Sequence, residues 1–159
     1  MKVAGQHYQT IWLDRENSKV FFIDQALLPF EFSIKSTNHH EDLINAIKTM
    51  QVRGAPVIGI TGALALLLGM STDCSDENLN NLSQEIIKAR PTAVNLAWAV
   101  NSMNEEIQKI PQERRLDFAW NHAEKLIQND IQCNHQIGVH GGQLIIDNNY
   151  NNILTHCNA

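Results

Sequence analysis

Apolar and polar residues alternate near the start of the chain and recur at helical spacing further on. The segments 10–13, 20–23 and 31–34 are short runs rich in β-branched and aromatic residues, and polar or proline-containing turns separate them. Runs of this kind predict β-strands. Because they are close in sequence, we expect them to form a small antiparallel sheet at the start of the protein.

The period changes to that of a helix after residue 37. Asn38, followed three residues later by Glu41, is a candidate capping box for the first helix. A second helix is predicted to begin at Pro56 and to run through residues 58–68, whose low polarity indicates burial on nearly all sides. The apolar positions of the first helix share one face and are Leu43, Ile44, Ile47 and Met50.

More helices are predicted in the rest of the chain. One ends by Arg90, since proline disfavours helical geometry in the residue before it, and the next begins at Pro91. Another follows Pro111, and a separate helical segment covers residues 133–146. An asparagine-rich turn and an apolar terminal strand complete the chain.

These elements predict an α+β fold in which a small N-terminal antiparallel sheet is followed by a helical bundle. We assign residues 1–150 to this β-plus-helical-bundle domain. Residues 151–159 read as the first strand of a second domain, because the apolar run that ends in Cys157 would need more chain to hold the thiol in place.

Composition narrows the class of protein. The 159 residues are 43% hydrophobic, which is typical of a globular domain. The formal net charge is -5 and the 12 Lys and Arg residues are scattered singly, so nucleic-acid binding is disfavoured. The segment 57–70 is too short and too interrupted by glycine to span a membrane, and with no apolar signal core at the start we expect a cytoplasmic protein. Three widely spaced cysteines argue against a disulfide framework.

The strongest local signal for binding chemistry is the segment 52–56. Arg53 and Gly54 stand directly before a helix that opens with proline. Free N–H groups and the dipole at a helix N-terminus favour an anion, glycine lets a ligand approach, and arginine offers a bidentate fork to phosphate. The alternative is that Arg53 is a surface residue and Gly54 only a turn.

Arg90 repeats the arrangement ahead of Pro91, so two arginines could converge on one phosphorylated ligand. The alternative is that Arg90 pairs with the C-terminus of the helix before it, which needs no ligand. The residues alone leave both readings open.

Cys157 is a candidate reactive thiol, and the alternative is a small buried hydrophobe at a strand end. A zinc site is disfavoured, because the spacing of the nearby candidate ligands fits no usual pattern. Those ligands would be Cys133, His135, His140, His156 and Cys157. We therefore predict no metal.

Several motifs together resemble one enzyme family. They are MQVRGAPVIG at 50–59, RPTAVNL at 90–96, IGVHG at 137–141 and ILTHCN at 153–158. In order and approximate spacing they resemble the methylthioribose-1-phosphate isomerases, and the opening strands are similar as well. The resemblance therefore covers the whole chain.

The resemblance implies an aldose-ketose isomerase of methionine salvage, which converts 5-methylthioribose 1-phosphate to 5-methylthioribulose 1-phosphate without a required cofactor. It implies that Arg53, Gly54 and Ala55 bind the substrate, that Arg90 reaches the phosphate and that Cys157 is the catalytic thiol. It also implies a homodimer for the full-length family. Acid-base groups in a dry pocket suit such a reaction, which opens a sugar ring and moves hydrogen between C2 and C1.

The chain departs from this family in length, because members are about twice as long, as a second domain would make them. A Rossmann-like C-terminal half with a catalytic aspartate would follow Cys157. We expect the 159-residue chain alone to have little or no isomerase activity.

Three other readings stay open. The related regulatory subunits of the eukaryotic translation-initiation exchange factor share the fold and bind partners or sugar phosphates without catalysis. Ribose-1,5-bisphosphate isomerase is a closer enzymatic alternative. A bare helical interaction module would show an exposed apolar patch.

Overall fold

The computed structural model describes residues 2–155. A short hairpin of β1 (Lys2–Val3) and β2 (Gln6–His7) precedes a three-stranded antiparallel sheet in the order β3-β4-β5. The sheet consists of β3 (Ile11–Asp14), β4 (Lys19–Ile23) and β5 (Ile34–Thr37). One face buries Val20 and Phe22 against the helices, whereas Trp12 and Phe21 stack on the other face with ring centroids 5.5 Å apart. The predicted antiparallel sheet is confirmed.

The third strand lies later in the chain than predicted. The prediction was 31–34, but β5 pairs with β4 so that Thr37 is opposite Val20. Phe32 instead packs its ring against Tyr8, with centroids 4.9 Å apart. The aromatic residue that suggested a strand therefore makes its contact outside the sheet.

Helix α1 (His40–Lys48) is capped differently from the prediction. Its N-cap is His39, so the capping box of Asn38 and Glu41 is wrong. Thr37 accepts a hydrogen bond from the His39 N–H at 3.0 Å, and its hydroxyl donates to Asp42 at 2.5 Å. The end of β5 thus supplies the polar groups that begin the helix.

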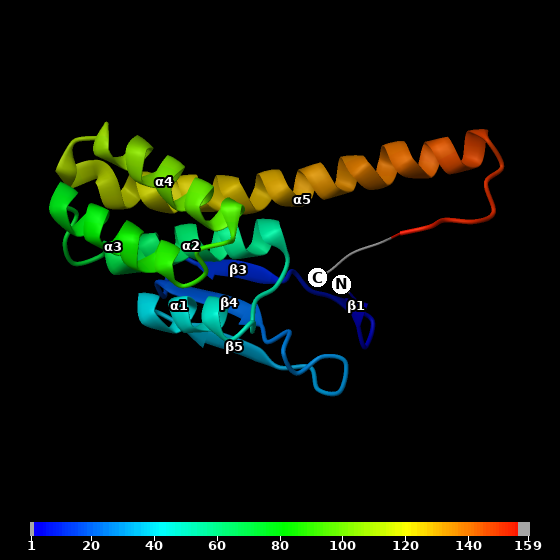
Figure 1. Ribbon diagram of the computed structural model, residues 1–159, viewed down its shortest axis with the longest axis horizontal. Helices are drawn as coiled ribbons and strands as arrows, with labels where there is room; N and C mark the ends of the chain where they lie inside the picture. Colours follow the sequence, from blue (N-terminus) through cyan, green and yellow to red (C-terminus); the bar gives the residue numbers. More distant parts are fainter. Residues whose placement is uncertain (1, 156–159) are drawn as a thin grey trace.

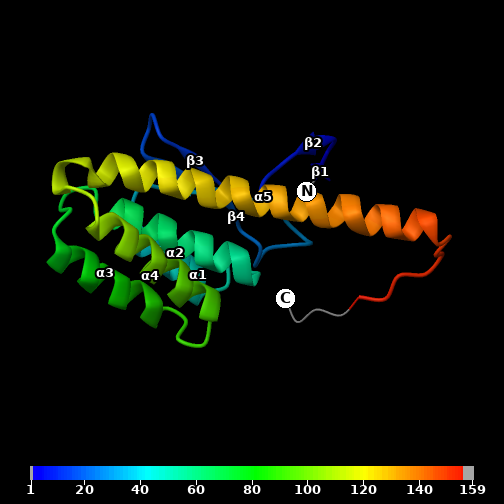
Figure 2. The ribbon, with the colours of Figure 1, turned by 90° about the horizontal axis from the view of Figure 1, so that it is seen from above.

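Helix α2 (Ala55–Gly69) is the centre of the domain, as predicted. All its residues from Ile58 to Leu68 are buried, and it packs against α1, α3, α4 and α5. In Figure 1, α2 lies between the sheet and the outer helices, and Figure 2 shows α5 crossing the bundle on the far side from α3. An apolar helix surrounded in this way holds the other elements in place.

The remaining helices are α3 (Asp76–Lys88), α4 (Val94–Gln108) and α5 (Arg115–Asp147), with a 3-10 turn at Gln112–Arg114. The two helical segments predicted after Pro111 are one continuous helix, and both views show its outer half extending beyond the bundle. No proline interrupts this stretch, so glycines that only lower helix propensity do not end it.

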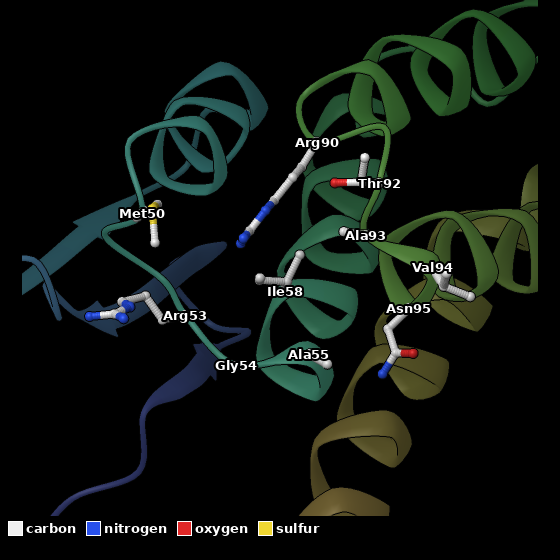
Figure 3. Close-up of a pocket in the computed structure, with 10 residues that line it drawn as sticks. All are labelled: Met50, Arg53, Gly54, Ala55, Ile58, Arg90, Thr92, Ala93, Val94 and Asn95. Carbon is white, nitrogen blue, oxygen red and sulfur yellow. The ribbon is translucent and has the colours of Figure 1, made fainter. Parts of the chain in front are cut away.

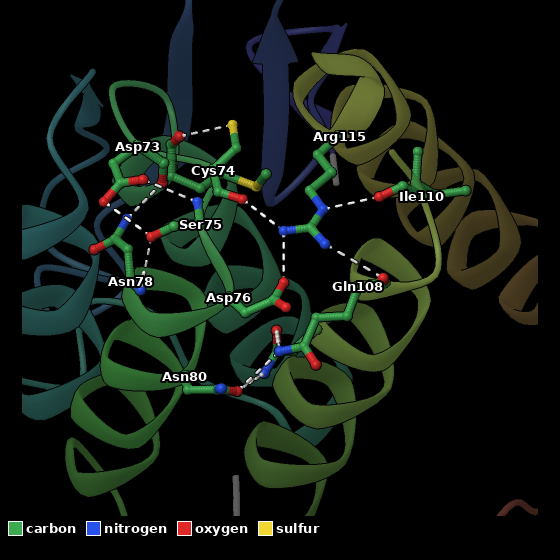
Figure 4. A network of polar contacts seen from close by, with 11 residues as sticks. Asp73, Cys74, Ser75, Asp76, Asn78, Asn80, Gln108, Ile110 and Arg115 are labelled. Carbon is green, nitrogen blue, oxygen red and sulfur yellow. Dashed lines mark hydrogen bonds and ion pairs between the residues drawn. The ribbon is translucent and has the colours of Figure 1, made fainter. Parts of the chain in front are cut away.

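A buried arginine joins the ends of three helices (Figure 4). Arg115 donates to the carbonyls of Ile110, Cys74 and Gln108, and it pairs with Asp76 at 2.6 Å. The start of α5, the end of α4 and the start of α3 are therefore fixed to one another.

Residues 151–155 form no helix or strand. A strand needs a neighbouring strand to bond with, and the described residues offer none at this place. Residues 156–159 lie outside the described part of the chain, so the assignment of 151–159 to a second domain stays a prediction.

Candidate functional site: two arginines at a hollow between helix starts

The loop between α1 and α2 carries the first predicted anion-binding motif. The buried side chain of Val52 anchors it in the core, and Gly54 is the N-cap of α2 with φ 90° and ψ 132°. Glycine adopts that conformation at no steric cost, whereas other residues are strained there. Gly54 therefore lets the chain turn from the buried Val52, through Arg53, into the first turn of α2.

The second motif begins its helix later than predicted. The first residue of α4 is Val94 and its N-cap is Ala93, so the predicted start at Pro91 is wrong. Residues 90–93 form a turn in which the Ala93 N–H donates to the Arg90 carbonyl at 2.9 Å. Proline suits the second position of such a turn because its φ is fixed. Arg90 therefore precedes a turn rather than a helix.

The starts of α2 and α4 come together because the two helices approach closely. A Cβ atom on Gly59 would lie 2.8 Å from the backbone oxygen of Asn95. Only glycine at position 59 allows the backbones to come this near. The two predicted motifs, far apart in sequence, consequently border one hollow (Figure 3).

The hollow has a volume of about 430 Å³. Both predicted arginines line it, with Gly54 and Ala55 from the predicted set, and no acidic side chain of residues 2–155 does so. The lining residues are Met50, Arg53, Gly54, Ala55, Ile58, Arg90, Thr92, Ala93, Val94 and Asn95.

The two arginine side chains differ in direction. In Figure 3 the guanidinium of Arg90 extends into the space between the 50–54 loop and α2, whereas that of Arg53 points away from Arg90. Both residues are partly buried, and neither guanidinium forms a hydrogen bond or ion pair with a described residue. The structure therefore contradicts the alternative in which the Arg90 side chain pairs with the C-terminal end of α3.

The local electrostatics favour an anion although the whole chain is acidic. Two cationic groups line the hollow, and the N-terminal turn of α2 leaves backbone N–H groups without partners inside the helix. The helix dipole adds partial positive charge at that end. The arrangement can bind a phosphate or a carboxylate at one side of the hollow.

The catalytic thiol predicted at Cys157 lies outside the described residues. The two described cysteines are no substitute for it at this site. Cys74 is partly buried, its thiol donates to the Met70 carbonyl at 3.3 Å, and burial raises the pKa of that thiol. Cys133 is exposed on the outer half of α5.

Within residues 2–155, no group of three or more His, Cys, Asp and Glu side chains is arranged to hold a metal ion. None of the helices in that part of the chain combines the length and the apolar character that a membrane span requires.

Sequence reasoning missed several polar residues that line the two hollows bordered by Arg53. Thr92 and Asn95 stand in the second motif but were given no role, and Gln25 lies beside Arg53 in an adjoining hollow. Thr92 and Asn95 could have been recognised from their place in the motif at 90–96. For Gln25 no local signal existed, because only the tertiary fold brings it to Arg53.

Comparison with known proteins defines the class. Residues 51–159 match the Initiation factor 2 subunit family, and the chain belongs to that family. The methylthioribose-1-phosphate isomerase of Sinorhizobium medicae is 39% identical over 166 residues, covering 100% of this chain and 46% of the relative. An uncharacterised protein of Rhodospirillum rubrum is 41% identical, and the match covers 92% of it. The chain thus spans under half the length of the named isomerases it matches.

Two solved structures share the fold. The 5-methylthioribose 1-phosphate isomerase of Pyrococcus horikoshii is 31% identical with a TM-score of 0.76, over 84% of this chain and 40% of that one. Subunit delta of the translation initiation factor eIF-2B from A. fulgidus is 28% identical with a TM-score of 0.78, over 87% of this chain and 42% of that one. The α+β class predicted from the sequence is confirmed.

Proposed function

We propose that this chain supplies the phosphate-binding part of a methylthioribose-1-phosphate isomerase. The reaction is the conversion of 5-methylthioribose 1-phosphate to 5-methylthioribulose 1-phosphate in methionine salvage. The observation that carries the proposal is the hollow at which Arg53, Arg90 and the start of α2 meet, in a chain whose named relatives are isomerases of this substrate.

Each residue has a role in the proposal. Arg90 holds phosphate oxygens by charge-assisted hydrogen bonds, Arg53 reaches the same anion once its guanidinium turns from the direction seen in Figure 3, and the backbone at Gly54 and Ala55 offers N–H groups to it. Holding the phosphate fixes the sugar so that its C1 and C2 atoms face the acid-base groups. Cys157 is proposed as the thiol that exchanges a proton there.

The rest of the proposal follows the family. Residues 1–150 form the N-terminal domain, and 151–159 begin a Rossmann-like domain that would bring the partner carboxylate. No cofactor or nucleic acid takes part, the protein acts in the cytoplasm, and the working unit is a homodimer.

The first experiment measures the binding of inorganic phosphate and ribose 1-phosphate to the 159-residue chain by calorimetry. We expect both to bind, and we expect Arg90→Met to weaken both by at least about 10-fold, since a hydrogen bond to a charged group contributes about 1.5–3 kcal/mol. Arg114→Met, at an exposed arginine, is the control. Unchanged affinity in Arg90→Met would remove the phosphate site from the proposal.

The second experiment tests catalysis in a chimera. This chain is fused to the part of the Sinorhizobium medicae relative that lies beyond its match, and the conversion of 5-methylthioribose 1-phosphate is followed. We expect turnover in the chimera, loss of turnover in its Cys157→Ser variant with binding retained, and little or no turnover by the 159-residue chain.

A second function is a non-catalytic sugar-phosphate binder, and the similarity to eIF-2B subunit delta favours it. In that case the chimera binds the sugar phosphate but converts none, and Cys157→Ser changes nothing. Ribose-1,5-bisphosphate isomerase is distinguished by the substrate that the chimera accepts.

A further inference from the structure

A second hollow adjoins the first at Arg53. Its volume is about 410 Å³, and it is lined by Gln25, Leu28, Pro29, Arg53 and Gly54. Arg53 and Gly54 line both hollows, so a ligand held at the first could extend past Gly54 into the second. The second hollow combines an apolar wall from Leu28 and Pro29 with the polar residue Gln25.

The carboxamide of Gln25 has an unusual position. Its Nε2 atom is buried and forms no hydrogen bond with any residue in the described range 2–155. A buried donor without a partner costs about 1–3 kcal/mol, so most such groups are paired in folded proteins. Because Gln25 as a residue is only partly buried and lines the second hollow, a turn of its side chain toward that hollow would give this amide a ligand oxygen as its partner.

The backbone around Gln25 is held rigidly. Its N–H donates to the Gln51 carbonyl at 2.8 Å, which ties the segment after β4 to the loop that carries Arg53. The buried carboxylate of Asp24 accepts from the Ala26 N–H at 3.1 Å and pairs with Lys35 at 2.8 Å. Lys35 also donates to the Gln51 side chain at 3.1 Å. These contacts fix the backbone at Gln25 relative to Gln51, which lies two residues before Arg53.

The chemistry of the group indicates what it would contact. A carboxamide both donates and accepts hydrogen bonds, as a hydroxyl does, whereas a phosphate group accepts only. Arg53, at the boundary, suits the acceptor-only phosphate, and Gln25 suits an uncharged hydroxyl further along the ligand. Leu28 and Pro29 offer an apolar surface to the C–H groups of a sugar ring or chain.

We propose that Gln25 is a substrate-binding residue, whose carboxamide hydrogen-bonds a hydroxyl of the sugar when the phosphate lies at Arg90 and the start of α2. The proposal rests on the proposed function. It assigns the second hollow to the sugar part of the ligand and the first to the phosphate.

The test compares two ligands on the 159-residue chain by calorimetry. Inorganic phosphate probes the arginine side alone, and ribose 1-phosphate adds the sugar. We expect Gln25→Met, which keeps the length of the side chain and removes its polar atoms, to weaken ribose 1-phosphate about 5- to 20-fold and to change phosphate affinity less than twofold. Gln84→Leu, at an exposed glutamine of α3, is the control and should change neither.

The outcomes separate the two proposals. If the wild type binds neither ligand, the phosphate site itself is wrong and the role of Gln25 falls with it. If the wild type binds both and Gln25→Met weakens both equally or neither, the phosphate site stands and the role of Gln25 is overturned. Far-UV circular dichroism checks folding, and Gln25→Leu, which also removes the polar atoms and adds no charge beside Arg53, should give the same selective loss if Gln25→Met does not fold.

Discussion

The two halves of α5 lie in different surroundings although they belong to one helix. The inner half buries Arg115, Ala119, Ala123 and Ile127 against the bundle. The outer half, residues 131–146, contains no Asp, Glu, Lys or Arg, yet it is largely exposed and includes three glycines whose Cβ positions would meet nothing within 4 Å. Packing stabilises the inner half, whereas the outer half depends on its own backbone hydrogen bonds.

This contrast has a consequence for function. The outer half exposes apolar side chains that the bundle does not cover. The side chains concerned are Ile137, Val139, Leu144 and Ile146. The hollow at Arg53 and Arg90, in contrast, is built by the packed part of the molecule, so the two regions can be altered separately.

The largest effect is expected at the inner end of α5. Arg115 is 7% exposed, and its guanidinium holds three carbonyls and the Asp76 carboxylate. Arg115→Met leaves the three carbonyls without this donor and Asp76 without its cation, so we expect the free energy of unfolding to fall by about 2–4 kcal/mol in urea titrations. The neighbouring exposed Arg114→Met should change it by less than about 0.5 kcal/mol. Equal effects of the two variants would mean that the contacts of Arg115 do not stabilise the packing of the inner half of α5.

The next effect concerns a packed glycine in the bundle. A Cβ on Gly62 would lie 2.3 Å from Cδ1 of Leu96 and 2.9 Å from Cγ2 of Val100, and both of those residues are fully buried. Gly62→Ala therefore overpacks the contact between α2 and α4, and we expect a loss of about 1–3 kcal/mol in the free energy of unfolding. Thermal unfolding at matched concentration measures it. A gain in stability would show that the side chains of α4 can move aside.

The sequence predicted the type and order of most elements because their apolar periodicity was strong. It placed the start of α4 at Pro91, because a proline resembles a helix start when only neighbouring residues are considered, and it divided α5 near residue 132, where the apolar periodicity of 116–131 ends. The start of α4 depends on the turn at 90–93, which only the structure shows. The continuity of α5 depends on the absence of a proline within it, which was visible in the sequence.

The candidate site was partly predictable for the same reason. Each arginine motif was recognisable by its local chemistry, but their convergence depends on the close approach of Gly59 to Asn95, which is a tertiary contact. Gln25 was not predictable, because an unpartnered buried amide can be recognised only in the folded chain. The role of Cys157 stays a prediction.

The outer half of α5 should respond to alanine in the opposite sense from the bundle. A Cβ on Gly141 would meet nothing within 4 Å, so Gly141→Ala adds helix propensity without strain. The gain is about 0.5–1 kcal/mol for the local helix, which corresponds to amide exchange about two- to fivefold slower around residues 138–146. Hydrogen-exchange mass spectrometry of that segment measures it, and amides of α2 serve as the internal control. Faster exchange in the variant would mean that the glycine makes a contact in solution.

The smallest expected effect is on the pH dependence of the free energy of unfolding, to which the inner and outer halves of α5 should contribute differently. Burial lowers the pKa of His122 on the inner half, and the nearby Glu106 carboxylate opposes part of that shift. A histidine whose pKa is lower in the folded chain gives its full stabilisation above the unfolded value of about 6.5, and the stabilisation is lost as pH falls through the folded pKa. We therefore expect the free energy of unfolding to decrease from pH 7.5 to pH 5 more steeply in the wild type than in His122→Gln. His140→Gln, on the exposed outer half, should keep the wild-type slope. If both variants flatten the slope equally, the inner half does not bury its histidine more deeply than the outer half does.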